Sequence, residues 1–403
     1  MRKIALASIS ALLLLTAFPN QLNAASITGT KCTKAGSTKT ASNIKYTCVK
    51  QGSKLVWNKG VAVKPVVKAT SSPTPTPVET PKPAAMPSPT PTATVAAFVP
   101  PKAPTSFDDL VENYKGISYA AWSKSKAKIA SSNATANNLV MHIGPNSVIP
   151  NPNPQIAYDL IAKLYDGFKT PPRTDILAFG WADRDWAELQ MKTIMPNSTW
   201  QWLKYTACAT QDTCWGGGAF RDANSNFLLV ITTEVKDANH TSGTLEAHEY
   251  THIIQQSQMR GEQPWPPSND WPPTWIIEGH AEFSQNVAVF TDSYDAYLKN
   301  RRDVSQNLFR DPKYDSAFFE KYFVVNPPSS WYDQYDRWNQ YEAGGMLVEI
   351  LTALKGPDSV MEMWRQMGLG LNFRDAFKKV YEYDFDKALP IMAKAIALEV
   401  GKS

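Results

Sequence analysis

A stretch rich in proline, threonine and serine divides this chain of 403 residues into two unequal parts. Its clearest portion is Ser72–Pro77, where proline alternates with serine or threonine. Such a stretch cannot bury enough apolar surface to fold, and its prolines keep the backbone extended. We therefore predict a linker over residues 63–104, with a small module at residues 25–62 before it and a larger globular domain after it.

Residues 1–24 have the pattern of a secretory signal peptide. Arg2 and Lys3 precede a mostly apolar run over residues 4–18, and the small residues Ala24 and Ala25 flank a candidate cleavage point. The apolar run is short for a membrane span, and an uncleaved anchor helix is the alternative interpretation. No later stretch is long and apolar enough to span a membrane. We therefore expect a mature protein without a membrane span that is secreted, extracellular or associated with a cell wall.

The four cysteines fall into two close pairs, Cys32 with Cys48 and Cys208 with Cys214. An even number of cysteines in an exported chain favours disulfides over reactive thiols. Metal binding is the competing interpretation, but neither pair has the two-residue gap that is typical of zinc thiolate sites. The sequence therefore predicts two disulfides with these pairings.

The module at residues 25–62 is predicted to be a basic β-hairpin. Residues 44–50 alternate in polarity, residues 51–53 favour a turn, and a second strand follows at residues 55–57. No acidic residue occurs before Glu79, whereas the residues after Lys102 carry 28 basic and 36 acidic side chains. This asymmetry favours attraction of the module to an anionic cell-wall polymer, with plain solubility as the alternative and no nucleic-acid partner expected.

Beyond residue 104 the composition becomes that of a globular α+β domain. Apolar residues recur at helical spacing over residues 156–168, and residues 226–233 form a candidate buried strand. After residue 240 the pattern is mostly helical, apart from a loop rich in tryptophan and proline over residues 263–273. We expect a mixed N-terminal lobe with a β-sheet at residues 105–240 and a mainly helical lobe at residues 241–403.

The residues His248-Glu249-Tyr250-Thr251-His252 form the pattern HExxH. On a helix, which we predict over residues 242–257, side chains four positions apart lie on one face, so both imidazoles can bind one ion. Glu249 can then reach a metal-bound water without acting as a ligand itself. This arrangement is typical of zinc peptidases, and a structural pair of histidines is the alternative.

A catalytic zinc ion needs a third protein ligand. The metzincin pattern requires glycine and histidine at positions that Gln255 and Gln258 occupy, so it does not apply. The other pattern takes a glutamate from a following helix, which the segment WIIEGHAEF at residues 275–283 supplies. With HExxH and this Trp-x-x-Glu-Gly-x-Ala-x-aromatic motif, the chain resembles the gluzincins from about Asn226 to Ala395.

This resemblance implies a zincin-like, two-lobed catalytic domain with one catalytic Zn²⁺ ion. His248, His252 and Glu278 would hold the metal, and Glu249 would be the general base. Glu282 lies one turn after Glu278, where gluzincins place an acid that supports a ligand histidine; an ordinary surface acid is the alternative.

Two further residues have expected roles, the first from its helical position and the second from the same resemblance. His280 should face away from the metal, and we interpret it as substrate-facing or structural rather than as a ligand. A helix that begins near Gln340 is similar to the tyrosine-bearing helix of several gluzincins. Tyr341 is then a candidate oxyanion stabiliser, with a merely packed tyrosine as the alternative.

The expected function is that of a secreted zinc metallopeptidase that hydrolyses peptide bonds of protein or peptide substrates. The segment Gly216–Phe220 lacks the acid with which gluzincin aminopeptidases bind a free amino terminus, which favours an endopeptidase. The strand at residues 227–233 is a candidate for pairing with an extended substrate. The alternatives are a degenerate zincin scaffold that binds the cell wall and a hydrolase of peptidoglycan peptides.

Overall fold

The computed structural model describes residues 31–41, 44–52, 54–58, 61–62, 98–196, 208–260, 271–324 and 335–402. The predicted signal peptide, residues 63–97 of the predicted linker and residues 263–270 of the loop rich in tryptophan and proline lie outside the described residues. The chain forms two compact units, Met1–Ala93 and Thr94–Ser403. In the described part of the chain, no helix is long and apolar enough to cross a membrane.

The first unit is a small antiparallel sheet built around its longest strand, β2. β2 (Ile44–Gln51) pairs with the other three strands, which are β1 (Thr38–Ala41), β3 (Lys54–Trp57) and β4 (Val61–Ala62). The predicted hairpin is therefore confirmed as β2 and β3. The predicted disulfide between Cys32 and Cys48 is also confirmed. Few apolar side chains are buried among the described residues of this unit. The cross-link stabilises such a small fold because it restricts the unfolded chain.

The second unit contains a four-stranded sheet with the order β5-β6-β8-β7. β5 (Leu139–Ile143), β6 (Thr174–Phe179) and β8 (Phe227–Thr232) are parallel, and the edge strand β7 (Gly217–Arg221) is antiparallel to β8. β6 and β8 are buried along their whole length. Side chains of β6 and β8 therefore alternate between two apolar clusters, one on each face.

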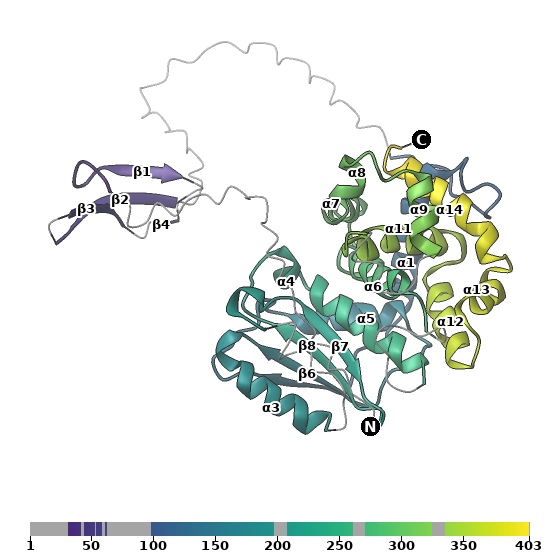
Figure 1. The fold of residues 1–403 in the computed structure, drawn as a ribbon, viewed down its shortest axis with the longest axis horizontal. Helices are drawn as coiled ribbons and strands as arrows, with labels where there is room; N and C mark the ends of the chain where they lie inside the picture. Colours follow the sequence, from purple (N-terminus) through teal and green to yellow (C-terminus); the bar gives the residue numbers. More distant parts are fainter. Residues whose placement is uncertain are drawn as a thin grey trace, which may run out of the picture. The chain divides into compact units, whose positions relative to one another are not determined.

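Helices cover both faces of this sheet (Figure 1). α3 (Arg184–Ile194) packs on β6, while α5 (Thr244–Gln258) packs on β7 and β8 and is backed by α2 (Pro154–Leu164). Because α5 lies between the sheet and the remaining helices, its side chains are almost all buried. The HExxH pattern predicted for this segment therefore lies in the interior of the molecule.

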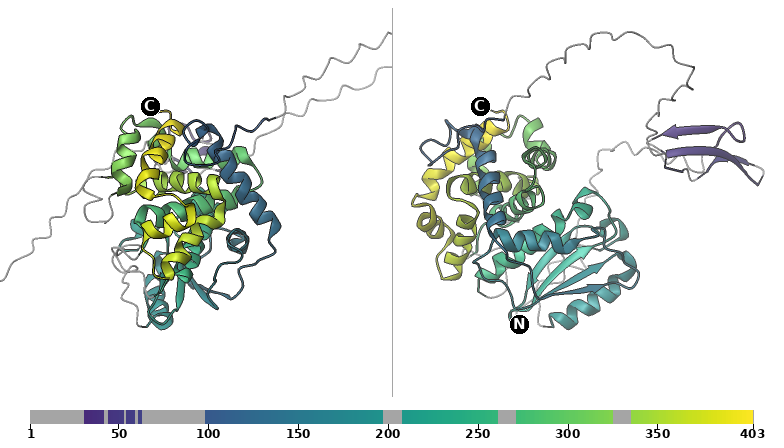
Figure 2. Two further views of the ribbon diagram at one scale, coloured as in Figure 1. Left: turned by 90° about the vertical axis from the view of Figure 1, so that its right-hand side faces the viewer. Right: turned by 180° about the vertical axis from the view of Figure 1, so that it is seen from behind.

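The most extensive contacts among the remaining helices join α6 (Thr274–Val289) and α11 (Asn339–Lys355). α1 (Ile117–Ser131), α7 (Tyr294–Val304), α12 (Pro357–Gly368) and α14 (Phe385–Glu399) pack on one or both of them, whereas α4 (Ala238–Ser242) packs on α5, α8 (Gln306–Arg310) on α7, α9 (Ser316–Val324) on α14, and α13 (Phe373–Tyr381) on α12 and α14. The unit is thus of the α+β class, as predicted. One helix departs from the expected lobes: α1 precedes the sheet in sequence but packs on α11 and α6 among the helices (Figure 2).

Two glycines allow α6 and α11 to cross at very short distance. A Cβ atom on Gly279 would lie 2.2 Å from the backbone carbon of Gly344, and one on Gly344 would lie 2.0 Å from the carbonyl oxygen of Trp275. Any larger residue at either position would force the helices apart. This crossing places Glu278 of α6 and Tyr341 of α11 on neighbouring turns of the two helices.

Candidate metal centre

The HExxH residues lie on α5, which the structure places at residues 244–258, close to the predicted range. The short helix α4 precedes it, and the two are joined at Gly243, whose φ of 93° is a left-handed conformation that favours glycine. This turn sets the direction of α5 beneath the sheet. His248 and His252 then lie one turn apart on the face that meets α6.

The structure brings His248, His252 and Glu278 together, with one ligand atom from each within 4.8 Å of the others. The two Nε2 atoms are 3.1 Å apart, and Oε2 of Glu278 lies 3.3 Å from Nε2 of His248 and 3.2 Å from that of His252. Ligand atoms of one tetrahedral zinc ion are separated by about 3.4 Å. The three donor atoms therefore have the spacing of a metal site, and nitrogen and carboxylate donors suit zinc.

The charges of this group also favour a cation at its centre. Burial disfavours the charged form of His252, but Glu278 and Glu249 outweigh burial and raise its pKa to about 9. Burial alone would raise the pKa of Glu278, yet the two histidines hold it below its usual value. For His248, burial is the strongest effect and lowers the pKa. The carboxylates of Glu278 and Glu249 thus create surroundings that favour positive charge at the centre of the group.

Glu249 lies on α5 next to the edge strand β7. A Cβ atom on Gly217 would lie 2.7 Å from Cγ of Glu249, so only a glycine lets the strand pass this close to the carboxylate. Burial raises the pKa of Glu249 to about 8. A buried carboxyl group with a raised pKa beside a metal group has the properties that a general base and acid require near neutral pH.

The expectation that the strand at residues 227–233 pairs with substrate is wrong. This segment is β8, which is hydrogen-bonded to β6 on one side and to β7 on the other. Its backbone groups are therefore used within the sheet. The strand that lies at the edge and passes Glu249 is β7.

Tyr341 lies on α11 near the glycine crossing with α6, and its ring is beside that of the predicted ligand His248. Its ring centroid is 5.7 Å from that of His248 and 5.6 Å from that of Trp338. Burial raises the pKa of the Tyr341 hydroxyl well above its usual value, and Glu278 and Glu249 add to this effect. The hydroxyl is therefore a proton donor, and not a phenolate, at neutral pH.

Glu282 is near His248 but does not form the expected hydrogen bond in this structure. Its Oε2 atom lies 3.9 Å from Nδ1 of His248, which is beyond hydrogen-bonding distance. Burial, reinforced by Glu342 and Glu278, raises the pKa of Glu282 to about 7. Glu282 is thus a buried acid close to a ligand, and not an ordinary surface acid.

His280 is completely buried, which excludes the substrate-facing interpretation and leaves the structural one. Its Nε2 lies 2.7 Å from the hydroxyl of Tyr165, and its Nδ1 lies 3.2 Å from Nε2 of Gln255. Oε1 of Gln255 is in turn 2.8 Å from Nδ1 of His252. Sequence reasoning missed Gln255, although its position one turn after a ligand histidine is a signal that could have revealed it.

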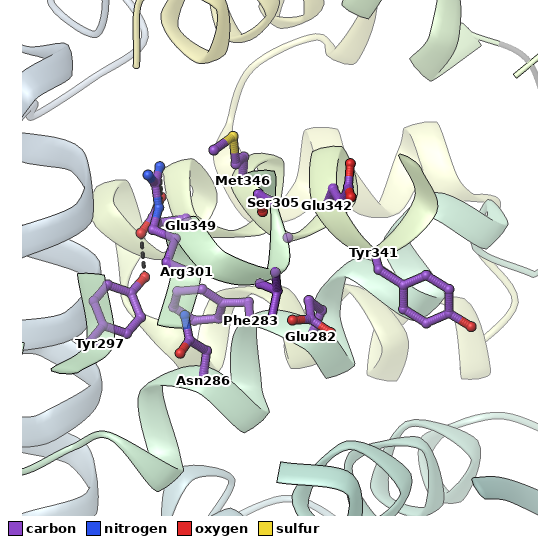
Figure 3. Close-up of a pocket in the computed structure, with 12 residues that line it drawn as sticks. Glu282, Phe283, Asn286, Tyr297, Arg301, Ser305, Tyr341, Glu342, Met346 and Glu349 are labelled. Atoms are coloured by element: carbon purple, nitrogen blue, oxygen red, sulfur yellow. Dashed lines mark hydrogen bonds and ion pairs between the residues drawn. The ribbon is translucent and has the colours of Figure 1, made fainter. Parts of the chain in front are cut away.

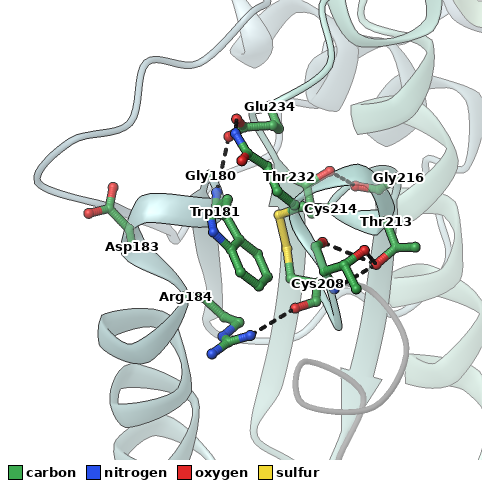
Figure 4. Close-up of a disulfide and its surroundings, with 12 residues drawn as sticks. Gly180, Trp181, Asp183, Arg184, Cys208, Thr213, Cys214, Gly216, Thr232 and Glu234 are labelled. Atoms are coloured by element: carbon green, nitrogen blue, oxygen red, sulfur yellow. Dashed lines mark hydrogen bonds between the residues drawn. A yellow bond between two sulfur atoms is a disulfide. The ribbon is translucent and has the colours of Figure 1, made fainter.

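The second predicted disulfide, Cys208–Cys214, is confirmed and lies just before β7 (Figure 4). Both cysteines are buried, and the carbonyl oxygen of Cys208 accepts a hydrogen bond of 3.4 Å from Arg184. Trp215 directly follows the disulfide, and its ring stacks on that of Trp338 with centroids 6.1 Å apart. The disulfide thus anchors the segment that enters the edge strand beside Glu249.

Comparison of the chain with protein-family models, with curated proteins and with solved structures gives no match.

Proposed function

We propose that this protein is a zinc-dependent endopeptidase with a zincin-like, two-lobed domain of the gluzincin type. The observation that carries the proposal is the convergence of His248, His252 and Glu278, with donor atoms 3.1–3.3 Å apart. A buried carboxylic acid, Glu249, lies directly beside this group. Together these residues supply a metal site and a proton acceptor, which are the two parts that hydrolysis by an activated water requires.

Each residue of the proposed site has a separate chemical role. His248, His252 and Glu278 would hold a zinc ion, which would supply a bound water with a pKa of about 7 and polarise the substrate carbonyl. Glu249 accepts the proton of the attacking water and delivers it to the departing amine. Tyr341 donates a hydrogen bond to the developing oxyanion from the opposite helix.

The edge strand β7 is the proposed binding surface for the peptide backbone. Its outer edge has no strand partner among the described residues, so an extended peptide can add to the sheet there by main-chain hydrogen bonds. Gly217 and Gly218 leave this edge free of side chains beside Glu249. The absence of an acid from Gly217–Arg221 favours an endopeptidase, because nothing on the strand would bind a free amino terminus.

The remaining expectations concern where the protein acts. Two disulfides are typical of exported proteins, because the cytosol keeps thiols reduced. We propose that the protein is secreted and that its lysine-rich first unit holds it at an anionic cell-wall polymer. A substrate among the peptides of the cell wall is compatible with the same metal site.

The proposal is tested with Glu249→Gln, which keeps the size of the side chain but removes the base. We expect about one zinc ion per chain by elemental analysis and a loss of about 10²–10⁴-fold in hydrolysis of a denatured protein. The matched control is Glu246→Gln, which changes another buried acid on the same helix and should retain both activity and zinc. Wild-type protein that binds zinc but cleaves no peptide bond, or a Glu249→Gln variant as active as the control, would overturn the proposal.

A further inference from the structure

A buried hydrogen-bond chain runs from the metal group to the far side of α6. It consists of His252, Gln255, His280, Tyr165 and Ser284, in that order. Consecutive members are 2.8, 3.2, 2.7 and 2.5 Å apart at their bonded atoms. All five residues are at least nine-tenths buried, so water cannot replace a missing partner.

Two backbone carbonyl oxygens determine the direction of every hydrogen bond in this chain, because a carbonyl can only accept. At one end, the hydroxyl of Ser284 donates to the carbonyl oxygen of His280 at 2.5 Å. Its single proton is then used, so the hydroxyl of Tyr165 must donate to Ser284. Tyr165 in turn accepts from Nε2 of His280, which leaves Nδ1 of His280 without a proton.

In the middle of the chain, the second carbonyl fixes the orientation of the Gln255 amide. Nε2 of Gln255 donates to the carbonyl oxygen of Ile277 at 3.1 Å and, with its other proton, to Nδ1 of His280. Oε1 of Gln255 therefore faces His252 and accepts the proton of its Nδ1. Because its Nδ1 donates to Gln255, His252 can bind a metal ion only through Nε2, the atom that points at Glu278 and His248.

We propose that Gln255 and His280 are positioning residues that hold His252 in the orientation and tautomer required for metal binding. The inference rests on the proposed metal site and adds to it the groups that prepare one ligand. A ligand imidazole whose other nitrogen donates to a fixed acceptor needs no reorientation when the ion binds. Loss of such a supporting group typically weakens metal binding by 10–100-fold.

The main test compares two substitutions of the same kind on α5. Gln255→Leu removes the acceptor of His252, whereas Gln258→Leu removes another buried glutamine whose amide donates to the carbonyl oxygens of Lys169 and Ile254. We expect the zinc dissociation constant, measured by competition with a chelator, to rise about 10–100-fold for Gln255→Leu and less than about threefold for Gln258→Leu. Equal zinc affinities for the two variants would show that Gln255 is only structural.

Two further variants guard against a failure to fold. Gln255→Glu retains an oxygen that accepts from Nδ1 of His252, so it should bind zinc within about threefold of wild type. Tyr165→Phe removes only the hydroxyl that accepts from His280, and it should weaken zinc binding by about threefold or more. The matched control is Tyr381→Phe, which removes a buried hydroxyl bonded to Ser359 and should leave zinc binding unchanged.

The outcomes distinguish this inference from the proposed function. If the wild-type protein binds no zinc, both the proposed metal site and this inference are wrong. Tight zinc binding by wild type together with unchanged binding by Tyr165→Phe and Gln255→Leu would overturn the inference and leave the proposed function intact. Measurement of zinc affinity needs no substrate, so neither result depends on peptide hydrolysis.

Discussion

Two clusters of buried polar residues lie in the helical part of the second unit, and they differ in whether they contain their own cation. In the first, Arg301 of α7 pairs with Glu349 of α11 at 2.6 Å and with Glu399 of α14 at 3.1 Å. Tyr297 donates a hydrogen bond to Glu349 (Figure 3). Burial opposes charge on Arg301, but the two glutamates outweigh it and raise its pKa further.

The second cluster consists of His248, His252 and Glu278, and it has no such guanidinium. In the described part of the chain, the only ion-pair partners of Glu278 are the two histidines. α11 carries Glu349 of the first cluster, and its Tyr341 lies beside His248 of the second. Figure 3 shows the side chain of Tyr341 extending away from the Arg301 cluster. The comparison indicates that a buried cluster with its own cation is complete as a structural element. A buried cluster of converging donors requires an ion from outside.

The largest expected effect on stability comes from removing the internal cation. Arg301→Met leaves the carboxylates of Glu349 and Glu399 buried without a cation, which should cost about 3–5 kcal/mol of unfolding free energy. The control is Lys299→Met on the same helix, where the exposed pair with Asp303 should contribute less than about 1 kcal/mol. Denaturant unfolding measures both. Equal losses would contradict the view that the Arg301 cluster is a structural ion pair.

We expect an added metal ion to stabilise the second cluster, whereas the first cluster contains Arg301 and needs no added ion. Zinc at about a thousandfold excess over its dissociation constant should stabilise the metal-free protein by about 4 kcal/mol. Glu278→Ala should abolish this stabilisation, whereas Arg301→Met should lower overall stability and keep it. Thermal melting with and without zinc checks the expectation, and a shift that survives in Glu278→Ala would place the ion elsewhere.

A comparable effect on catalysis is expected where α11 reaches the metal group. Tyr341→Phe removes one hydroxyl and should lower kcat by about 10²–10³-fold, or ~2.7–4 kcal/mol in the activation barrier. Zinc content and melting temperature should stay unchanged, which separates this role from that of the ligands. The measurement is steady-state hydrolysis of a peptide, with Tyr381→Phe as control. Activity within a few-fold of wild type would mean that Tyr341 is only packed.

The smallest effect is expected for a cluster that water reaches. Burial raises the pKa of Asp175 on β6, but its bonds to Arg173 and His142 outweigh burial and lower it. Because the folded pKa lies below the unfolded one, the contribution is present above pH about 4 and is lost as the pH falls through the folded pKa. Asp175→Asn should cost at most about 1 kcal/mol at pH 7 and nothing near pH 2, in urea unfolding.

Much of the candidate site could be predicted because its signals are local. The spacing of His248 and His252 places both on one face of any helix, and α5 forms close to the predicted range. The motif around Glu278 likewise predicts α6, which the structure places at residues 274–289. Both disulfides join cysteines that are close in sequence. None of these predictions needed knowledge of which elements pack together.

The predictions that failed all depended on packing. The strand at residues 227–233 was identified correctly as β8, but only strand order decides whether a strand is at an edge. α1 precedes the sheet in sequence, yet it buries its apolar side on α11 and α6. Glu282 has the spacing of a supporting acid, but its distance to His248 depends on how α6 lies against α5. Such relations involve residues far apart in the chain, which periodicity cannot report.

The sequence by itself determined which donor atoms share a helix face, since the α-helix repeats every 3.6 residues in any context. Only the tertiary structure decided that Tyr165 supports His280 across 115 positions of the chain and that α11 meets α6 at two glycines. A buried polar group needs a hydrogen-bond partner, and packing decides which residue is close enough to be that partner. A close helix crossing in turn requires that no side chain lies at the point of contact. Local spacing could therefore identify the ligands, while their supporting groups became visible only in the folded chain.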